Sequence, residues 1–163
     1  MKTTLWTAQV VWGVIFSVSG LGKILCYQPA LWNQATHQVP WFSAVPQGLF
    51  VFIGICEFLG GVGLILPAMT GFRPRLTPIA AIGLTAVMIL AALFHIERGE
   101  YYFLPINLGL AGVAAFIAYG RLYLRPIAAS ALNPSRVLKG LTVLSALVLV
   151  DFAPVLYRLA HTH

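Results

Sequence analysis

Residues 47–68 read QGLFVFIGICEFLGGVGLILPA, and this stretch decides the fold. As a helix it is long enough to cross ~30 Å of hydrocarbon, because each residue adds about 1.5 Å of rise. Glu57 is its one charged residue. Four further apolar stretches of similar length accompany it: Leu5–Leu25, Leu76–His95, Tyr102–Tyr119 and Val137–Tyr157. The sequence therefore predicts five membrane-spanning helices.

The composition supports the same conclusion. Of the 163 residues, 60% are hydrophobic and 9% charged, with a mean hydropathy of +0.88. Soluble domains average about 45–50% apolar and about 25% charged residues. These values exclude a soluble enzyme, a nucleic-acid-binding domain and a disordered tail, and they predict an all-α integral membrane protein in a lipid bilayer. We expect the first span to remain as a membrane helix rather than act as a cleaved signal peptide, because its apolar stretch is long.

The basic residues predict an orientation. The chain carries ten Lys and Arg against four Asp and Glu. Most of these basic residues fall in short loops, so they indicate membrane orientation rather than a nucleic-acid partner. With a cytoplasmic N-terminus, the inner segments hold Lys2, Arg73, Arg75, Arg121, Arg125, Arg136 and Lys139. The outer segments then hold Lys23, Arg98 and Arg158. This asymmetry favours a cytoplasmic N-terminus and, with five spans, an external C-terminus.

The longest connection, residues 26–46, is placed on the outside. It contains three prolines that are expected to break regular helix, together with Trp32, His37, Trp41 and Phe42. Aromatic residues at this level commonly form an interfacial belt. The same residues would also suit a lid over a site that opens to the outer face, and both interpretations remain open.

Redox cysteines and metal ligands are not expected. Cys26 and Cys56 form no CxxC motif and lie at different depths, which favours packing roles. The histidines show no paired spacing of the kind that metal sites use, so the sequence predicts no metal site.

Polar residues within the spans are the informative ones, because ionisable groups in a bilayer are costly and normally face other helices or a cavity. They are Lys23, Glu57, His95, Asn107 and Asp151. The first four share helical faces with small residues, which mark packing surfaces. We therefore expect these four to converge inside a bundle, in its outer half.

Two interpretations of this cluster remain open. In the first, Lys23 pairs with Glu57, and His95 and Asn107 supply hydrogen bonds that hold the bundle together. In the second, Glu57 and His95 are catalytic groups that handle protons, while Lys23 and Asn107 bind and orient a polar head group. A quinone carbonyl needs that combination, because its reduction requires proton donors. Asp151 is a secondary candidate. Either it is capped or paired in a helix that packs on the bundle or on a partner subunit, or it is an additional proton-handling acid.

Four short motifs resemble the DoxX-like family of membrane proteins. They are the G-x-x-K pattern at Gly20–Lys23, E-x-x-G-x-x-x-L at Glu57–Leu64, H-x-x-x-G at His95–Gly99, and the stretch from Leu104 to Arg121. They occur in order over residues 5–125. The resemblance carries over Lys23, Glu57 and His95 as functional positions.

The resemblance implies an antiparallel four-helix bundle over residues 1–125, in a bacterial inner membrane. Residues 126–163, with an inner loop and a fifth C-terminal transmembrane helix, depart from the family pattern. We expect a membrane subunit of quinone-linked electron transfer that binds quinone, or another apolar small molecule, in the outer half. The sequence shows no motif for a covalent cofactor, nucleotide, flavin or cluster, so a protein partner subunit would supply electrons. The alternative is a non-catalytic scaffold or assembly subunit of a larger complex.

Overall fold

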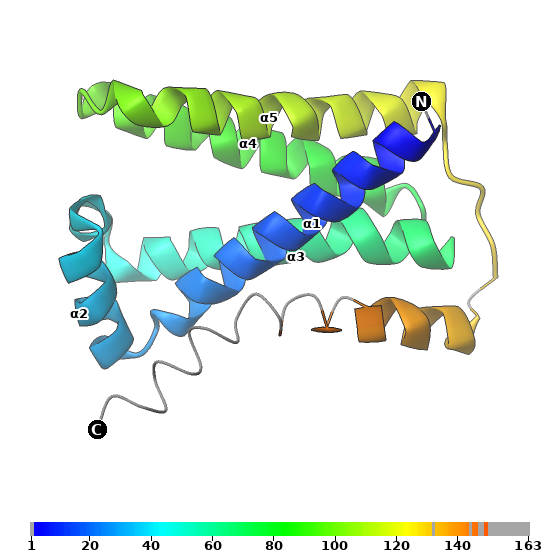
Figure 1. Cartoon of the computed structure of the whole chain (residues 1–163), viewed down its shortest axis with the longest axis horizontal. Coiled ribbons are helices and arrows are strands. Elements are labelled where there is room, and N and C mark those ends of the chain that lie inside the picture. The colour runs from blue at the N-terminus through cyan, green and yellow to red at the C-terminus, as the bar shows by residue number, and fades with distance from the viewer. Residues whose placement is uncertain (1, 132, 144, 147–148, 150–163) are drawn as a thin grey trace.

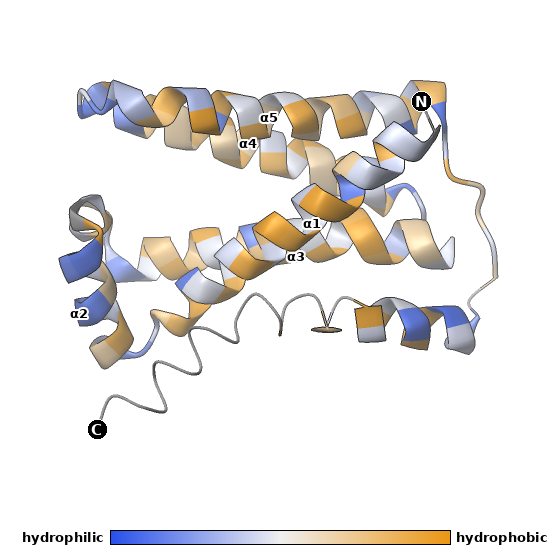
Figure 2. Ribbon diagram, in the orientation of Figure 1, coloured by the Kyte–Doolittle hydropathy of each residue, from blue (hydrophilic) through white to orange (hydrophobic). Residues whose placement is uncertain are grey.

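The computed structural model describes residues 2–131, 133–143, 145–146 and 149, and the regular elements in this part are helices. Four of them are long and apolar enough to cross a membrane. They are α1 (Lys2–Leu25), α3 (Gln47–Thr70), α4 (Leu76–Glu97) and α5 (Leu104–Tyr119). Apolar residues recur along all four (Figure 2). The first four predicted spans are confirmed, and the chain is an integral membrane protein.

The fourth span is longer than predicted. A short 3-10 turn, η2 (Tyr101–Phe103), precedes α5, and a π-helical turn, η3 (Gly120–Leu124), extends it. Together these elements form one membrane-spanning segment, Tyr101–Leu124. The sequence prediction ended at Tyr119, so it left the last helical turn in the following loop.

The four long helices form two pairs. Figure 1 shows α1 beside α3 and α4 beside α5, with α1 crossing toward the C-terminal end of α5. One end of the bundle holds the C-terminus of α1, the N-terminus of α3, α2 (Pro29–Gln38) and η1 (Pro40–Ala44). We call it the α2 end. The opposite end holds the N-terminus of α1 and η3, and we call it the Arg121 end.

Glycines allow the close approach of α1 and α3. A Cβ built on Gly54 would lie 2.6 Å from the Cβ of Lys23, and one built on Gly13 would lie 2.6 Å from Cγ1 of Ile65. Larger side chains at these positions would clash, so small residues let the two backbones pack directly. Because Gly54 lies one turn before Glu57, the contact also brings Glu57 within reach of Lys23.

The connection between α1 and α3 is more helical than expected. Pro29 is the first residue of α2 and Pro40 the first of η1. These prolines separate α1, α2 and η1 and each begins a new helix, because the first helical position needs no backbone N–H and suits the fixed φ of proline. The Trp32 ring of α2 lies 5.3 Å from the Phe50 ring of α3, measured between centroids, which anchors α2 to the bundle.

The described residues support four spans, not five. Residues 134–143 are helical, and a Cβ on Gly140 would lie 3.1 Å from Cδ2 of Leu66 in α3. Before this helix, the Ser130 hydroxyl donates to the carbonyl oxygen of Thr70 at 2.9 Å. Figure 1 shows the helix beginning beside the end of α3. Much of the predicted fifth span, including Asp151, lies outside the described residues, so that span is not supported.

At the Arg121 end, α1 and α5 are in contact. Arg121 is only 7% exposed, and its Nε donates a hydrogen bond to Oε1 of Gln9 at 2.7 Å. The guanidinium also lies 4.7 Å from the centre of the Trp6 ring. The sequence analysis assigned Arg121 to an inner loop, and the structure corrects this, because its helical turn directs the side chain into the bundle.

Candidate functional site

A cavity of about 500 Å³ opens between the two helix pairs toward the α2 end. Residues from all four long helices, from η1 and from η2 line it, and most of them are apolar or aromatic. The structure brings four of the residues singled out from the sequence to this cavity: Lys23, Glu57, His95 and Asn107. An apolar cavity with a few convergent polar groups is the usual form of a small-molecule site.

Lys23 and Glu57 form an ion pair on the wall made by α1 and α3. The Lys23 Nζ lies 2.6 Å from Oε2 of Glu57, whose side chain is 4% exposed. The Ser19 hydroxyl donates to the same oxygen at 2.9 Å and accepts a hydrogen bond from Lys23 at 2.7 Å. Each charge therefore has a partner of opposite sign, which offsets part of the cost of removing it from water.

His95 and Glu100 form a second acid–base pair, contributed by α4 and the turn that follows it. Nδ1 of His95 lies 2.7 Å from Oε2 of Glu100. Gly99 makes this contact possible, because its φ of +70° reverses the chain and brings Glu100 back over the end of α4. The Glu100 side chain remains 16% exposed, whereas that of His95 is 4% exposed.

Arg98 completes this group from the exposed side. Its Nε donates to Oε1 of Glu100 at 2.9 Å, and one terminal nitrogen lies 2.9 Å from the same oxygen. The hydrogen bond from Arg98, with the smaller contribution from His95, lowers the pKa of Glu100. Glu100 is therefore held as a carboxylate. The sequence analysis did not single out Glu100, although its spacing of five residues from His95 across a glycine offered a signal.

Aromatic rings surround the His95 side chain. The Trp41 ring of η1 lies 5.0 Å from the imidazole and the Phe103 ring of η2 lies 4.3 Å from it, both measured between centroids. Phe94 adds a third ring at 5.4 Å. The imidazole is therefore held in a fixed, largely apolar setting at the cavity wall.

Asn107, in the first turns of α5, differs from the other polar residues of the cavity. Its Nδ2 is buried and has no hydrogen-bond partner among the described residues. Leaving a buried donor unpaired costs about 1–3 kcal/mol. An acceptor oxygen on a bound ligand would remove this cost, because Asn107 lines the cavity.

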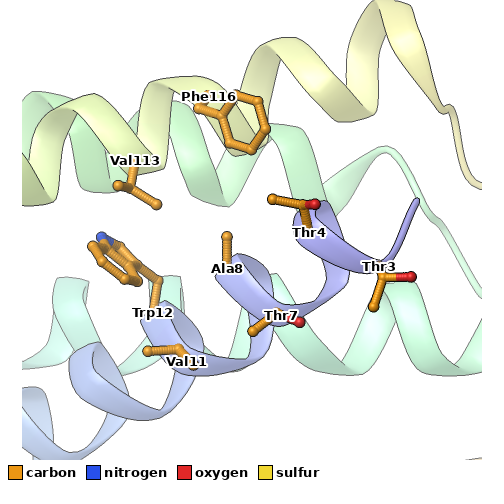
Figure 3. Close-up of a pocket in the computed structure, with 8 residues that line it drawn as sticks. All are labelled: Thr3, Thr4, Thr7, Ala8, Val11, Trp12, Val113 and Phe116. Atoms are coloured by element: carbon orange, nitrogen blue, oxygen red, sulfur yellow. The ribbon is translucent and has the colours of Figure 1, made fainter. Parts of the chain in front are cut away.

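A second hollow lies between the first half of α1 and α5, and Figure 3 shows its lining. It has a volume of about 530 Å³ and is a wide, open groove lined by Thr3, Thr4, Thr7, Ala8, Val11, Trp12, Val113 and Phe116. None of these residues titrates, and none was predicted as a site residue. Its position on the outside of the bundle suits contact with lipid rather than chemistry.

Metal and redox centres built from side chains are not evident in the part of the chain that the structure describes. There, no group of three or more His, Cys, Asp and Glu side chains could hold a metal ion. Cys26 and Cys56 are both free.

Comparison with known proteins identifies one family that matches most of the chain. Residues 7–117 match a family model described as the DoxX-like family. No curated protein and no solved structure matches the chain. The matched residues extend from α1 into α5 and include Lys23, Glu57, His95 and Asn107. Because this match covers more than half of the 163 residues, the resemblance drawn from the motifs is confirmed. The chain belongs to the DoxX-like family.

Proposed function

We propose that this protein binds a quinone, or another apolar small molecule bearing a carbonyl oxygen, in the cavity at the α2 end. The observation that carries the proposal is the buried, unpaired Nδ2 of Asn107 in a largely apolar cavity. A carbonyl oxygen would accept its hydrogen bond, and the ring of the ligand would pack against the aromatic side chains. The cavity volume of about 500 Å³ falls within the ordinary range for ligand sites.

The polar groups of the cavity suit reduction of such a ligand. Conversion of a quinone to a quinol takes two electrons and two protons, and each carbonyl oxygen becomes a hydroxyl. Lys23 and Glu57 lie on the wall from α1 and α3, and His95 lies on the wall from α4. In this proposal Glu57 and His95 exchange the protons, while Lys23 and Asn107 bind and orient the oxygens.

The electrons would come from a partner subunit with a redox centre, such as a reduced flavin or a haem. The protein would then be a membrane subunit of quinone-linked electron transfer. We also propose a bacterial inner membrane location with a cytoplasmic N-terminus, which places the α2 end and its cavity on the outer side. An external C-terminus would require the fifth span, and Asp151 would then be an additional proton-handling acid.

Ligand analysis of the purified protein tests this proposal. The protein is extracted in mild detergent, and bound lipids and quinones are identified by mass spectrometry. The wild type should retain a quinone that Asn107→Leu and Glu57→Gln lose. Thr7→Val, in the open groove between α1 and α5, is the matched control and should retain it. Equal quinone content in all four proteins would contradict the proposal.

A second candidate function is a scaffold or assembly subunit without catalysis. The observation in its favour is the Lys23–Glu57–Ser19 cluster, whose groups satisfy one another and join α1 to α3. If this is the main role, Asn107→Leu should leave association with the native partner and partner activity intact. Loss of partner activity in an assembled complex containing Asn107→Leu would favour the quinone-linked role instead.

A further inference from the structure

The two nitrogens of the His95 ring lie in different settings. Nδ1 is 2.7 Å from Oε2 of Glu100, whereas Nε2 has no hydrogen-bond partner among the described residues. The aromatic rings of Trp41 and Phe103 enclose the imidazole, and His95 lines the cavity. A bound ligand would therefore meet His95 through Nε2.

The carboxylate of Glu100 can only accept a hydrogen bond, so the hydrogen of the neutral ring belongs on Nδ1. Arg98 holds Glu100 in this state through Nε and a terminal nitrogen, both 2.9 Å from Oε1. No other charged group contacts the imidazole among the described residues. Asn107 and Trp41 face the same cavity as neutral groups, and Lys23 and Glu57 line it as a mutually paired set.

We infer that Glu100, oriented by Arg98, is a positioning residue that fixes the tautomer of His95 and thereby sets the hydrogen-bonding character of Nε2. The neutral ring then presents Nε2 to the cavity as an acceptor, and only the imidazolium presents it as a donor. The neutral ring suits a hydroxyl group, and the charged ring suits a carbonyl oxygen. This last statement rests on the proposed function and implies that neutral His95 favours the quinol form.

The proton transfer at one ligand oxygen balances on His95, while the electrons that reduce the quinone come from the redox centre of the proposed partner subunit. The imidazolium gives the proton on Nε2 to the ligand oxygen, and the ring becomes neutral with its hydrogen on Nδ1. In the reverse direction a quinol hydroxyl returns its proton to Nε2. Glu100 remains a carboxylate throughout, so it orients His95 without exchanging a proton itself.

The tautomer can be measured on the ligand-free, full-length protein in lipid nanodiscs. The four histidines are labelled with ¹⁵N, and the His95→Gln spectrum assigns the signals of His95. At a pH high enough for a neutral ring, the wild type should carry its hydrogen on Nδ1. Glu100→Gln should shift population toward the other tautomer, because the glutamine amide can also donate to Nδ1. Glu100→Asp, which keeps the carboxylate, should restore much of the original tautomer.

Glu97 supplies the matched control, since it is an exposed glutamate near the same helix end that forms no ion pair with the described residues. Glu97→Gln should give the wild-type tautomer. Identical spectra for Glu100→Gln and Glu97→Gln would overturn the inference, as would a wild-type ring with its hydrogen on Nε2.

A second measurement tests the consequence for the ligand. The dissociation constants of decylubiquinone and its quinol are compared at the same pH. Glu100→Gln should reduce the preference for quinol by roughly tenfold, the change expected from one hydrogen bond of ordinary net strength. An unchanged ratio would overturn the inference. If the wild type binds neither form, the proposed function fails, and the ¹⁵N spectra still decide the role of Glu100.

Discussion

The two ends of the bundle contain buried charge in different arrangements. At the Arg121 end, a guanidinium hydrogen-bonds to Gln9 and stacks on Trp6, and α1 is drawn against the end of α5. At the α2 end, the helix pairs separate around a cavity lined by Lys23, Glu57 and His95. Buried charged residues therefore join two helices at one end of the bundle and line a cavity at the other.

Removal of Lys23 should have the largest effect on stability. Lys23→Met leaves the Glu57 carboxylate buried without its cation, so we expect a loss of about 3 kcal/mol in the free energy of unfolding. Unfolding in detergent, followed by circular dichroism, measures this. The double variant Lys23→Met with Glu57→Gln should recover much of the loss, because no buried charge remains. A single variant as stable as the wild type would show that the pair does not stabilise the α2 end.

Truncation at the opposite end should have the next largest effect and should leave the ligand site unchanged. Arg121→Ala removes a buried hydrogen bond to Gln9 and the contact with Trp6, and we expect a loss of about 2 kcal/mol. The exposed Arg125 offers a control, and Arg125→Ala should change stability by less than about 0.5 kcal/mol. Equal losses of stability in Arg121→Ala and Arg125→Ala would show that the buried contacts of Arg121 do not stabilise this end of the bundle.

Asn107→Leu should have the reverse effects of Arg121→Ala, because it should lower the affinity for the ligand without lowering the stability of the protein. The substitution removes a buried donor without a protein partner, so the free energy of unfolding should stay the same or rise. The affinity for a quinone should fall by roughly tenfold, because the ligand loses a hydrogen bond. Calorimetry and ligand titration on one preparation measure both quantities. A large loss of stability with unchanged affinity would assign Asn107 to the packing of the bundle.

Acid should weaken the contacts of Glu100, and this is the smallest effect. Its hydrogen bonds with Arg98 and His95 lower its pKa in the folded protein. A carboxyl group with a lowered pKa contributes stability above its unfolded pKa, about 4.3, and loses that contribution as pH falls through the folded value. The melting temperature should therefore decline on acidification, with less decline in Glu100→Gln. The melting temperature of Glu97→Gln should depend on pH as that of the wild type does. If Glu100→Gln also shows the wild-type dependence, the contacts of Glu100 do not contribute to stability.

The sequence was sufficient to predict the four membrane-spanning helices, because long apolar stretches have few other structures in a bilayer, but it did not predict α2 and η1. It also grouped Glu57 with the glycines of its helical face, which are buried in the structure. The contact of His95 with Glu100 could not be predicted in this way, since it depends on the chain reversal at Gly99. Arg121 was misplaced for a related reason, because a π-helical turn continues the helix past Gly120, where the apolar pattern ends.

The most direct test of the proposed ligand site is quinone quenching of single tryptophans in nanodiscs. One variant retains only Trp41, in the cavity wall, and the other retains only Trp12, in the open groove. The account predicts saturable quenching of Trp41 that Asn107→Leu weakens by roughly tenfold, and only weak, non-saturable quenching of Trp12. Equal, non-saturable quenching of both tryptophans would contradict a quinone site at the α2 end.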